Sequence, residues 1–159
     1  MSNNNTQSVL SFQLGNELLG VDVQKVLEVL RNKGVTPIPR SEDFVRGIVQ
    51  FRGEIVTVID FSEKLNLYNN APTSGNVVIV FQITNTPQPF KVGILADSVK
   101  AVDELTTNQI KPVEEMNHYF NPEYLQGIYK KDNDFVVMLD IEKIFSEKDI
   151  QIIKNTANN

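Results

Sequence analysis

The single histidine, His118, is the residue best suited to proton transfer in this chain of 159 residues. A Ser-His-Asp arrangement would have to use it, but the sequence contains no nucleophile elbow of the form G-x-S-x-G. The chain has no cysteine, which excludes a thiolate nucleophile, a zinc ribbon and a disulfide framework. We therefore interpret His118 as a surface residue in a connector between the late strands.

Carboxylates supply two further candidates for chemistry. Asp60 and Asp140 could act as a paired acid and base, but they follow equivalent strands, as two helix caps would. Asp132-Asn133-Asp134 begins like a calcium loop without the later Gly and Glu of an EF-hand, so a turn between Tyr129 and Phe135 explains it better. The sequence has no glycine-rich phosphate-binding motif. We expect no catalytic residue, metal or cofactor, and keep an enzyme using Asp60 or Asp140 as a third hypothesis.

All four arginines lie between Arg31 and Arg52, close to Phe44 and Phe51. Positive charge beside aromatic rings on a β surface could bind single-stranded nucleic acid through backbone charge and stacking. The net charge of -5 and the pI near 4.9 argue against such a partner. A nucleic-acid-binding β-barrel protein using the Arg31 to Arg52 region is the alternative function.

Short segments rich in Val, Ile and Phe recur between turn residues, which predicts a mainly β fold. Residues 9–21 and 47–59 alternate in the manner of strands around turn residues, and each is predicted to form a hairpin. The apolar period changes near residues 23–28, where we expect a short helix or helical turn. Asp60 is expected to cap a helical turn through Leu65.

The ends of the chain have their own patterns. Residues 1–8 are polar and uncharged, which predicts a flexible arm without the features of a secretory signal. The longest apolar run, Val77–Phe81, is far too short to span a bilayer as a helix, so a cytoplasmic location is expected. Ser146 and Asp149 are spaced like a capping box and predict a C-terminal helical tail over 148–159 with a frayed end.

The most informative feature is that the second half of the chain repeats the motifs of the first half in the same order. Phe12-Gln13-Leu14 matches Phe81-Gln82-Ile83, and Ile55–Asp60 matches Phe135–Asp140. A duplication predicts two subdomains of about five strands each, and each is small enough to need support from the other. SH3-like barrels that share an apolar seam would close such short strands.

Together these segments resemble the CheW family of bacterial chemotaxis coupling proteins. The resemblance runs from about Val9 to Phe145 and is carried by the segments Gly20–Val29, Pro37–Pro39 and Phe44–Val56, with further matches in the second half. It implies two intertwined five-stranded SH3-like barrels with short helices and a C-terminal helix. One domain would cover 9–147, with interleaved subdomains at about 9–68 and 77–145. The chain departs from the family at Gln50 and Phe51, where Asn and Leu are usual, and at Thr57, where Pro is usual.

The resemblance implies a non-enzymatic adaptor with no cofactor, no nucleic-acid partner and no membrane insertion of its own. Such proteins bridge the cytoplasmic tips of methyl-accepting chemotaxis receptors to the regulatory domain of the chemotaxis histidine kinase. The chain would then act as a scaffold in a signalling array, associated with the membrane only through its partners.

The resemblance also implies two interaction surfaces. Receptor tips are helical hairpins, so an apolar groove at the seam between the barrels would receive one helix face. The groove residues would be Val26, Glu28, Val29, Gly47, Arg52, Val99 and Val102. Kinase contact would use exposed apolar residues at the barrel ends, for which Phe51, Ile55 and Tyr129 are candidates.

Each of these residues also has a structural interpretation. The valines could simply be buried, because Val at strand spacing usually belongs to a core. Glu28 and Arg52 are expected to lie close together, either shaping the groove or only holding the second hairpin in place. Gly47 and Gly127 could instead serve tight backbone packing.

Overall fold

A computed structural model describes residues 6–39, 41–65, 72–112 and 121–158, and its dominant feature is ten β-strands in two sheets. In the first half the elements are β1 (Thr6–Leu14), β2 (Glu17–Asp22), the 3-10 helix η1 (Val23–Lys25), β3 (Val26–Arg31), β4 (Val45–Phe51), β5 (Glu54–Ile59) and α1 (Phe61–Lys64). In the second half they are β6 (Val77–Ile83), β7 (Phe90–Ala96), β8 (Ser98–Thr106), η2 (Thr107–Gln109), η4 (Pro122–Tyr124), β9 (Leu125–Lys131), β10 (Asp134–Leu139) and α2 (Glu147–Ala157).

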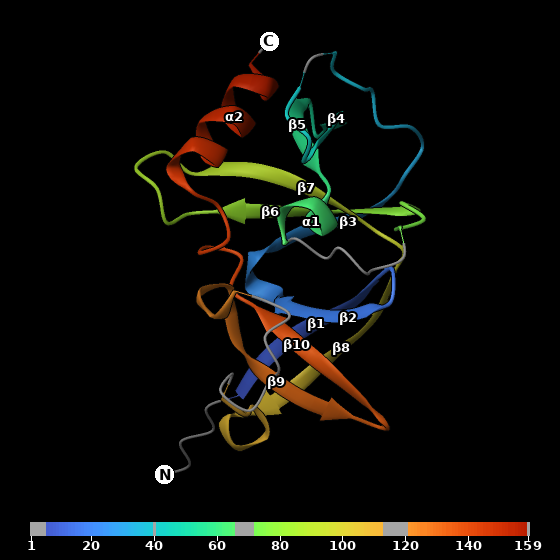
Figure 1. Ribbon diagram of the computed structural model, residues 1–159, viewed down its shortest axis with the longest axis vertical. Coiled ribbons are helices and arrows are strands. Elements are labelled where there is room, and N and C mark those ends of the chain that lie inside the picture. The colour runs from blue at the N-terminus through green and yellow to red at the C-terminus, as the bar shows by residue number, and fades with distance from the viewer. Residues whose placement is uncertain (1–5, 40, 66–71, 113–120, 159) are drawn as a thin grey trace.

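The two sheets have the same strand order but exchange a hairpin. One sheet, here called barrel A, is ordered β8-β1-β2-β10-β9, and the other, barrel B, is ordered β3-β6-β7-β5-β4. Barrel B lies above barrel A in Figure 1. Barrel A therefore contains the hairpin β1–β2 from the first half of the chain and three strands from the second half. Barrel B contains the hairpin β6–β7 from the second half and three strands from the first half. Residues 9–68 and 77–145 are not themselves the two barrels, because the chain crosses between the sheets after β2 and again after β7.

Matching contacts confirm the duplication. Isolated bridges join Thr36 to Ile48 in the first half and Lys111 to Ile128 in the second. The backbone N–H of Asp60 donates to the carbonyl of Phe44 at 2.8 Å, and that of Asp140 donates to the carbonyl of Tyr124 at 2.7 Å. Every one of these residues occupies the position that the sequence repeat assigns to its counterpart.

Apolar side chains form one core between the barrels and one core inside each barrel. The shared core combines residues from both barrels with side chains of the helices and of the segment before α2. In it the rings of Phe61 and Phe145 lie with their centroids 6.4 Å apart and their planes tilted by 38°. The interior of barrel B contains Val56 and Val58, and the interior of barrel A contains their counterparts Val136 and Met138. The seam between the barrels is therefore a packed core.

Two predicted boundaries were wrong. The helical segment expected over 23–28 ends at Lys25, and β3 begins at Val26. Val26 and Val29 pair with β6, and Leu27 packs against the interior core of barrel B, so a strand forms here. The arm expected over 1–8 was wrong for residues 6–8, which belong to β1, where Thr6 pairs with Thr106. β-branched residues at these spacings fit a strand as well as a helical turn.

The helices begin where polar caps were predicted. The Asp60 side chain accepts from the backbone N–H of Ser62 at 2.8 Å at the start of α1. The Asp140 side chain accepts from that of Glu142 at 3.1 Å, but the residues after Asp140 form a turn, so the helix cap expected there was wrong. Ser146 and Asp149 form a reciprocal capping box at the start of α2. α2 has 11 residues and covers Glu147–Ala157, within two residues at each end of the helical tail predicted over 148–159. Among the described residues, no helix is long and apolar enough to cross a membrane.

Candidate functional site

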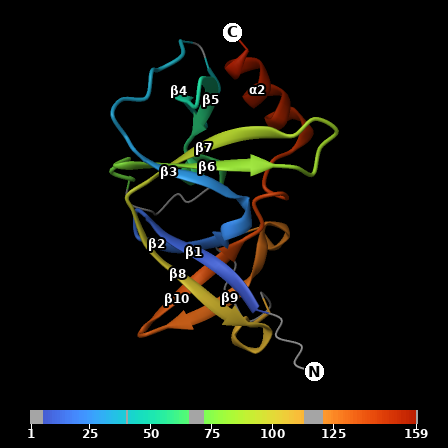
Figure 2. The same ribbon diagram turned by 180° about the vertical axis from the view of Figure 1, so that it is seen from behind.

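The predicted groove valines come from β3 and β8, which occupy equivalent edge positions in the two sheets (Figure 2). Val26 and Val29 of β3 and Val99 of β8 are partly buried and pack against the same shared core. All three residues therefore border the core that the two barrels share. Val102 differs, because 60% of it is exposed.

Glu28 and Arg52 form the expected pair. Arg52 Nη2 donates to Glu28 Oε1 at 3.3 Å, and the guanidinium also lies 4.8 Å from the ring centroid of Phe51. Their side chains are 66% and 44% exposed, so solvent screens the charges and the pair contributes only about 0 to 1 kcal/mol to folding. Arg52 has a φ of 52° in the β4–β5 turn, which holds its side chain across the open side of barrel B toward β3.

Gly47 has a backbone role. A Cβ at Gly47 would lie 2.1 Å from the carbonyl oxygen of Thr36, and one at Gly127 would lie 2.7 Å from that of Lys111. Both glycines have positive φ values, 149° and 156°, which side chains rarely adopt. Glycine at position 47 is thus required for the connector to pair with β4, which is the backbone role considered for it, and its place in the groove stays a prediction.

Two of the three kinase-contact candidates are not exposed. Phe51 packs inside barrel B and Tyr129 inside barrel A, where they are 4% and 2% exposed. Alternation along a strand did not reveal which face these residues occupy. Ile55 is 41% exposed, and its counterpart in the repeat, Phe135, is 59% exposed. Aligning the two halves of the chain would have found Phe135, because it occupies the position of Ile55 after the matching hairpin turn.

A hydrogen-bonded cluster closes the seam of barrel A. The Tyr129 hydroxyl donates to Asp103 Oδ2 at 3.2 Å, and Lys131 Nζ lies 2.6 Å from Asp103 Oδ1. Burial raises the pKa of Tyr129 far above its usual value, and the adjacent Asp103 carboxylate raises it further. Tyr129 therefore stays protonated and joins β9 to β8.

Each crossover between the barrels is tied to a hairpin turn. At the first crossover, Lys25 Nζ lies 2.8 Å from Glu142 Oε2, and Glu142 also accepts from the backbone N–H groups of Thr84 and Asn85 at 3.0 and 2.9 Å. Burial alone would raise the pKa of Glu142, but the hydrogen bonds from Lys25, Thr84 and Asn85 outweigh it and hold the pKa below its usual value.

The second crossover uses Asp97 in the same way. Its side chain accepts from the backbone N–H of Gly15 at 3.2 Å and from that of Ser74 at 2.8 Å, and it is also hydrogen-bonded to the Thr73 hydroxyl. These polar contacts join segments that belong to different barrels. They fix the relative positions of β3 and β8, which carry the predicted groove residues.

The remaining candidates for chemistry have mostly structural surroundings. Asp60 caps α1 and lies 4.0 Å from Arg46, and Asp132 forms the β9–β10 turn with a φ of 55°. The described part of the chain contains no group of three or more His, Asp or Glu residues that could hold a metal ion. His118 and Arg40 lie outside the described residues. Nucleic-acid binding stays an untested alternative.

Comparisons with known proteins address the family directly. A model of the CheW-like domain matches residues 8–149. The chain is 34% identical over 151 residues to the chemotaxis protein CheW of Klebsiella aerogenes, covering 95% of this chain and 89% of that protein. It is 28% identical to the chemotaxis protein CheW of Treponema pallidum, with 92% and 86% covered.

A solved structure shares the fold. The crystal structure of the scaffolding protein TtCheW from Thermoanaerobacter tengcongensis matches with a TM-score of 0.74 at 26% identity, and the alignment covers 88% of both chains. The structural match and the matched region of the domain model, residues 8–149, each include strands of both barrels. From its sequence, its duplicated strand order and these matches, the chain belongs to the CheW-like family.

Proposed function

We propose that this chain is a non-enzymatic chemotaxis adaptor that couples the cytoplasmic tips of methyl-accepting receptors to the chemotaxis histidine kinase in a signalling array. The observation that carries the proposal is the CheW-like match over residues 8–149, together with relatives named as chemotaxis and scaffolding proteins. The polar groups of the chain fit such a role, since Asp60 and Ser146 cap helices and Asp140 accepts a hydrogen bond within a turn.

The receptor surface in this proposal is the apolar strip formed by β3 and β8. Val26, Val29 and Val99 present partly buried side chains there, and Val102 adds an exposed one. A helix face needs apolar residues held on a rigid support, and the shared core and the two crossover clusters provide that support. The Glu28–Arg52 pair lies at the border of this strip and supplies charge for orientation.

The kinase surface in this proposal is at the barrel ends. Ile55 and Phe135 are exposed apolar residues at the tips of the two equivalent hairpins, in different barrels. A protein with two such ends can contact two neighbours at once, which a scaffold in an extended array requires.

Co-sedimentation with receptor cytoplasmic fragments and with the kinase tests both surfaces. We expect Val102→Glu to reduce receptor binding by about tenfold or more and to leave kinase binding unchanged, because it places a charge in an apolar contact. Ile55→Glu should have the opposite effect. Both side chains are substantially exposed, so the melting temperature of each variant should match the parent. Unchanged binding of both partners by both variants would refute the proposal.

A further inference from the structure

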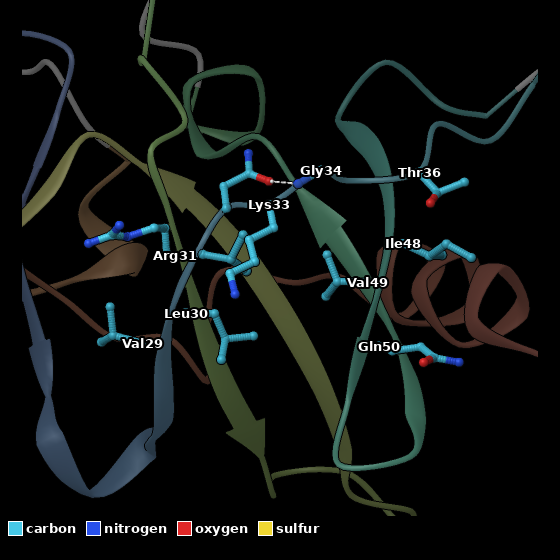
Figure 3. A pocket seen from close by; sticks show the side chains of 11 residues that line it. Val29, Leu30, Arg31, Lys33, Gly34, Thr36, Ile48, Val49 and Gln50 are labelled. Carbon is cyan, nitrogen blue, oxygen red and sulfur yellow. Dashed lines mark hydrogen bonds between the residues drawn. The ribbon is translucent and has the colours of Figure 1, made fainter.

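Barrel B has an open cleft of about 640 Å³ between its two edge strands, β3 and β4. Leu30 of β3 and Val49 of β4 point into the cleft, and Val78 of β6 also lines it (Figure 3). The cleft ends at the Thr36–Ile48 bridge on one side. Its apolar lining leads directly to the interior core of barrel B, against which Leu30 and Val49 pack.

The same place in barrel A is occupied by the chain's own side chains. In the sequence repeat Val49 corresponds to Tyr129, and Leu30 corresponds to Asp103. Tyr129 is buried, and its hydroxyl donates to Asp103 across the seam between β9 and β8. At these two positions barrel B has apolar side chains instead, a valine in place of the tyrosine ring and a leucine in place of the carboxylate that accepts its hydrogen bond. In barrel A the tyrosine ring and its hydrogen bond therefore occupy the space between the two edge strands. In the part of barrel B that the structure describes, no such ring or hydrogen bond lies there, and the cleft is open.

The edges of the cleft also carry backbone groups that are free to pair. Asn32 donates its backbone N–H to Asn76, so alternation along β3 directs the backbone groups of Val29 and Arg31 away from β6 and toward the cleft. Ile48 pairs outward with Thr36, so the backbone of Gln50 faces the same edge of β4. Among the described strands, none pairs with β3 on that side. An extended segment could add to this edge.

The charge around the cleft is positive. Lys33 extends over the opening and Arg31 lies at its outer border, and neither forms an ion pair with another described residue (Figure 3). None of the residues that line the cleft is acidic. Glu28, which precedes Val29, is already paired with Arg52. An occupant of complementary chemistry carries carboxylates.

From these features we propose that the β3–β4 cleft binds an extended segment of a partner protein, with an apolar side chain inserted between Leu30 and Val49 and a carboxylate beside Lys33. The segment would pair with the free edge of β3. This site goes beyond the proposed function, because it recognises an extended strand and uses residues other than the exposed Val102 and Ile55.

Fluorescence anisotropy with a labelled peptide tests the proposal. The probe is acetyl-Glu-Thr-Leu-Thr-Val-Glu-amide, and its counterpart has Lys in place of both Glu. We expect the acidic peptide to bind the full chain at least about tenfold more tightly than the basic one, and to shift the NMR signals of the Val29 and Arg31 amides. Equal binding of the two peptides, or no binding of the acidic one, would overturn the proposal.

Two double variants measure separately how the apolar lining and the positive charge of the cleft contribute to peptide binding. Leu30→Asp/Val49→Tyr copies the closed seam of barrel A and should weaken peptide binding by about tenfold or more. Arg31→Glu/Lys33→Glu changes exposed residues, so it should fold normally and weaken binding by a similar factor. Lys100→Glu/Lys130→Glu makes the same charge change on exposed positions of barrel A and should leave binding unchanged.

The charge variant keeps the test decisive if the pocket variant fails to fold. Parental affinity of Arg31→Glu/Lys33→Glu for the acidic peptide would overturn the proposal. Co-sedimentation with the receptor fragment should stay at the parental level in that variant. The cleft and the adaptor function can therefore fail separately.

Discussion

At the residue scale, the charged part of the predicted receptor surface is the Glu28–Arg52 pair. We expect Arg52→Ala to change the free energy of unfolding by less than about 1 kcal/mol, because both charges are largely solvated. The same change should weaken receptor co-sedimentation, since it removes the charge at the border of the β3–β8 strip. Lys100→Ala is a matched control, because Lys100 is an exposed cation on β8. If Arg52→Ala is unfolded in a thermal melt, the pair is structural.

Glu142 provides a pH-dependent test of the crossover. Its pKa is below the usual value of 4.5, so the folded state binds fewer protons than the unfolded state. The stabilisation from Glu142 is therefore complete above pH 4.5 and is lost as the pH falls through the lowered pKa. Glu142→Gln should cost about 1 to 2 kcal/mol at neutral pH and less at low pH, measured by urea denaturation.

The exposed Glu63 of α1 is the control for that experiment. Glu63→Gln removes the same formal charge away from the crossover and should have little effect at any pH. A Glu142→Gln variant whose loss of stability is the same at neutral and acidic pH would contradict the role given to this carboxylate.

The residues that could be assigned from the sequence were those with local partners. Asp60 and Ser146 were recognised as caps because the cap lies within a few residues of the group it satisfies. Phe51 and Tyr129 were misassigned because both faces of β4 and β9 carry apolar residues next to a turn, so alternation does not distinguish the interior from the surface. The Tyr129–Asp103 contact depends on β8 lying beside β9, which no local pattern predicts.

At the element scale, α2 is attached to barrel B by a buried hydrogen bond. The Thr57 hydroxyl on β5 donates to the carbonyl of Ile153 at 2.7 Å, and Lys64 of α1 lies 2.5 Å from Asp149 in the first turn of α2. Burial alone would raise the pKa of Asp149, but bonds from Lys64 and Ser146 hold it below its usual value. A proline at position 57, which is usual in the family, would have no hydroxyl to donate.

We therefore expect Thr57→Val to loosen α2. The change keeps the side-chain shape but removes the donor, and it should cost about 1 kcal/mol, with faster hydrogen exchange confined to Glu147–Ala157. Thr36→Val, at an exposed threonine of the connector, is the control. Unchanged exchange in α2 would show that apolar packing of the helix is sufficient to hold it.

The elements themselves were largely predictable, and their partners were not. The hairpins at residues 9–21 and 47–59 were found because strand alternation and turn residues are local signals. The segment after Asp22 was assigned too much helix because the spacing of Val23, Val26 and Leu27 fits both periods. This segment forms a strand because it pairs with β6, which is distant in the sequence. Arg31, for example, pairs with Val77, more than 45 positions later in the chain.

At the scale of the whole molecule, the duplication is more than two copies in a row. Each half of the chain contributes two strands to one barrel and three to the other, so neither half contains a complete sheet. The motif repeat predicted two units, but the exchange of hairpins depends on which crossover leads to which barrel. That choice is stabilised by the Lys25–Glu142 and Asp97 clusters, which join segments far apart in the sequence.

The exchange leads to a test with separated halves. Residues 1–72 and 73–159, produced as two polypeptides, should each be largely unfolded, because a two-stranded hairpin and a three-stranded remainder leave the shared core exposed. Mixed in equal amounts they should assemble into the parental fold, with a melting temperature that rises with concentration. Circular dichroism and size-exclusion chromatography measure both effects. Cooperative unfolding of one half alone would mean that this half folds without strands from the other, and the hairpin exchange would then not be needed for its folding.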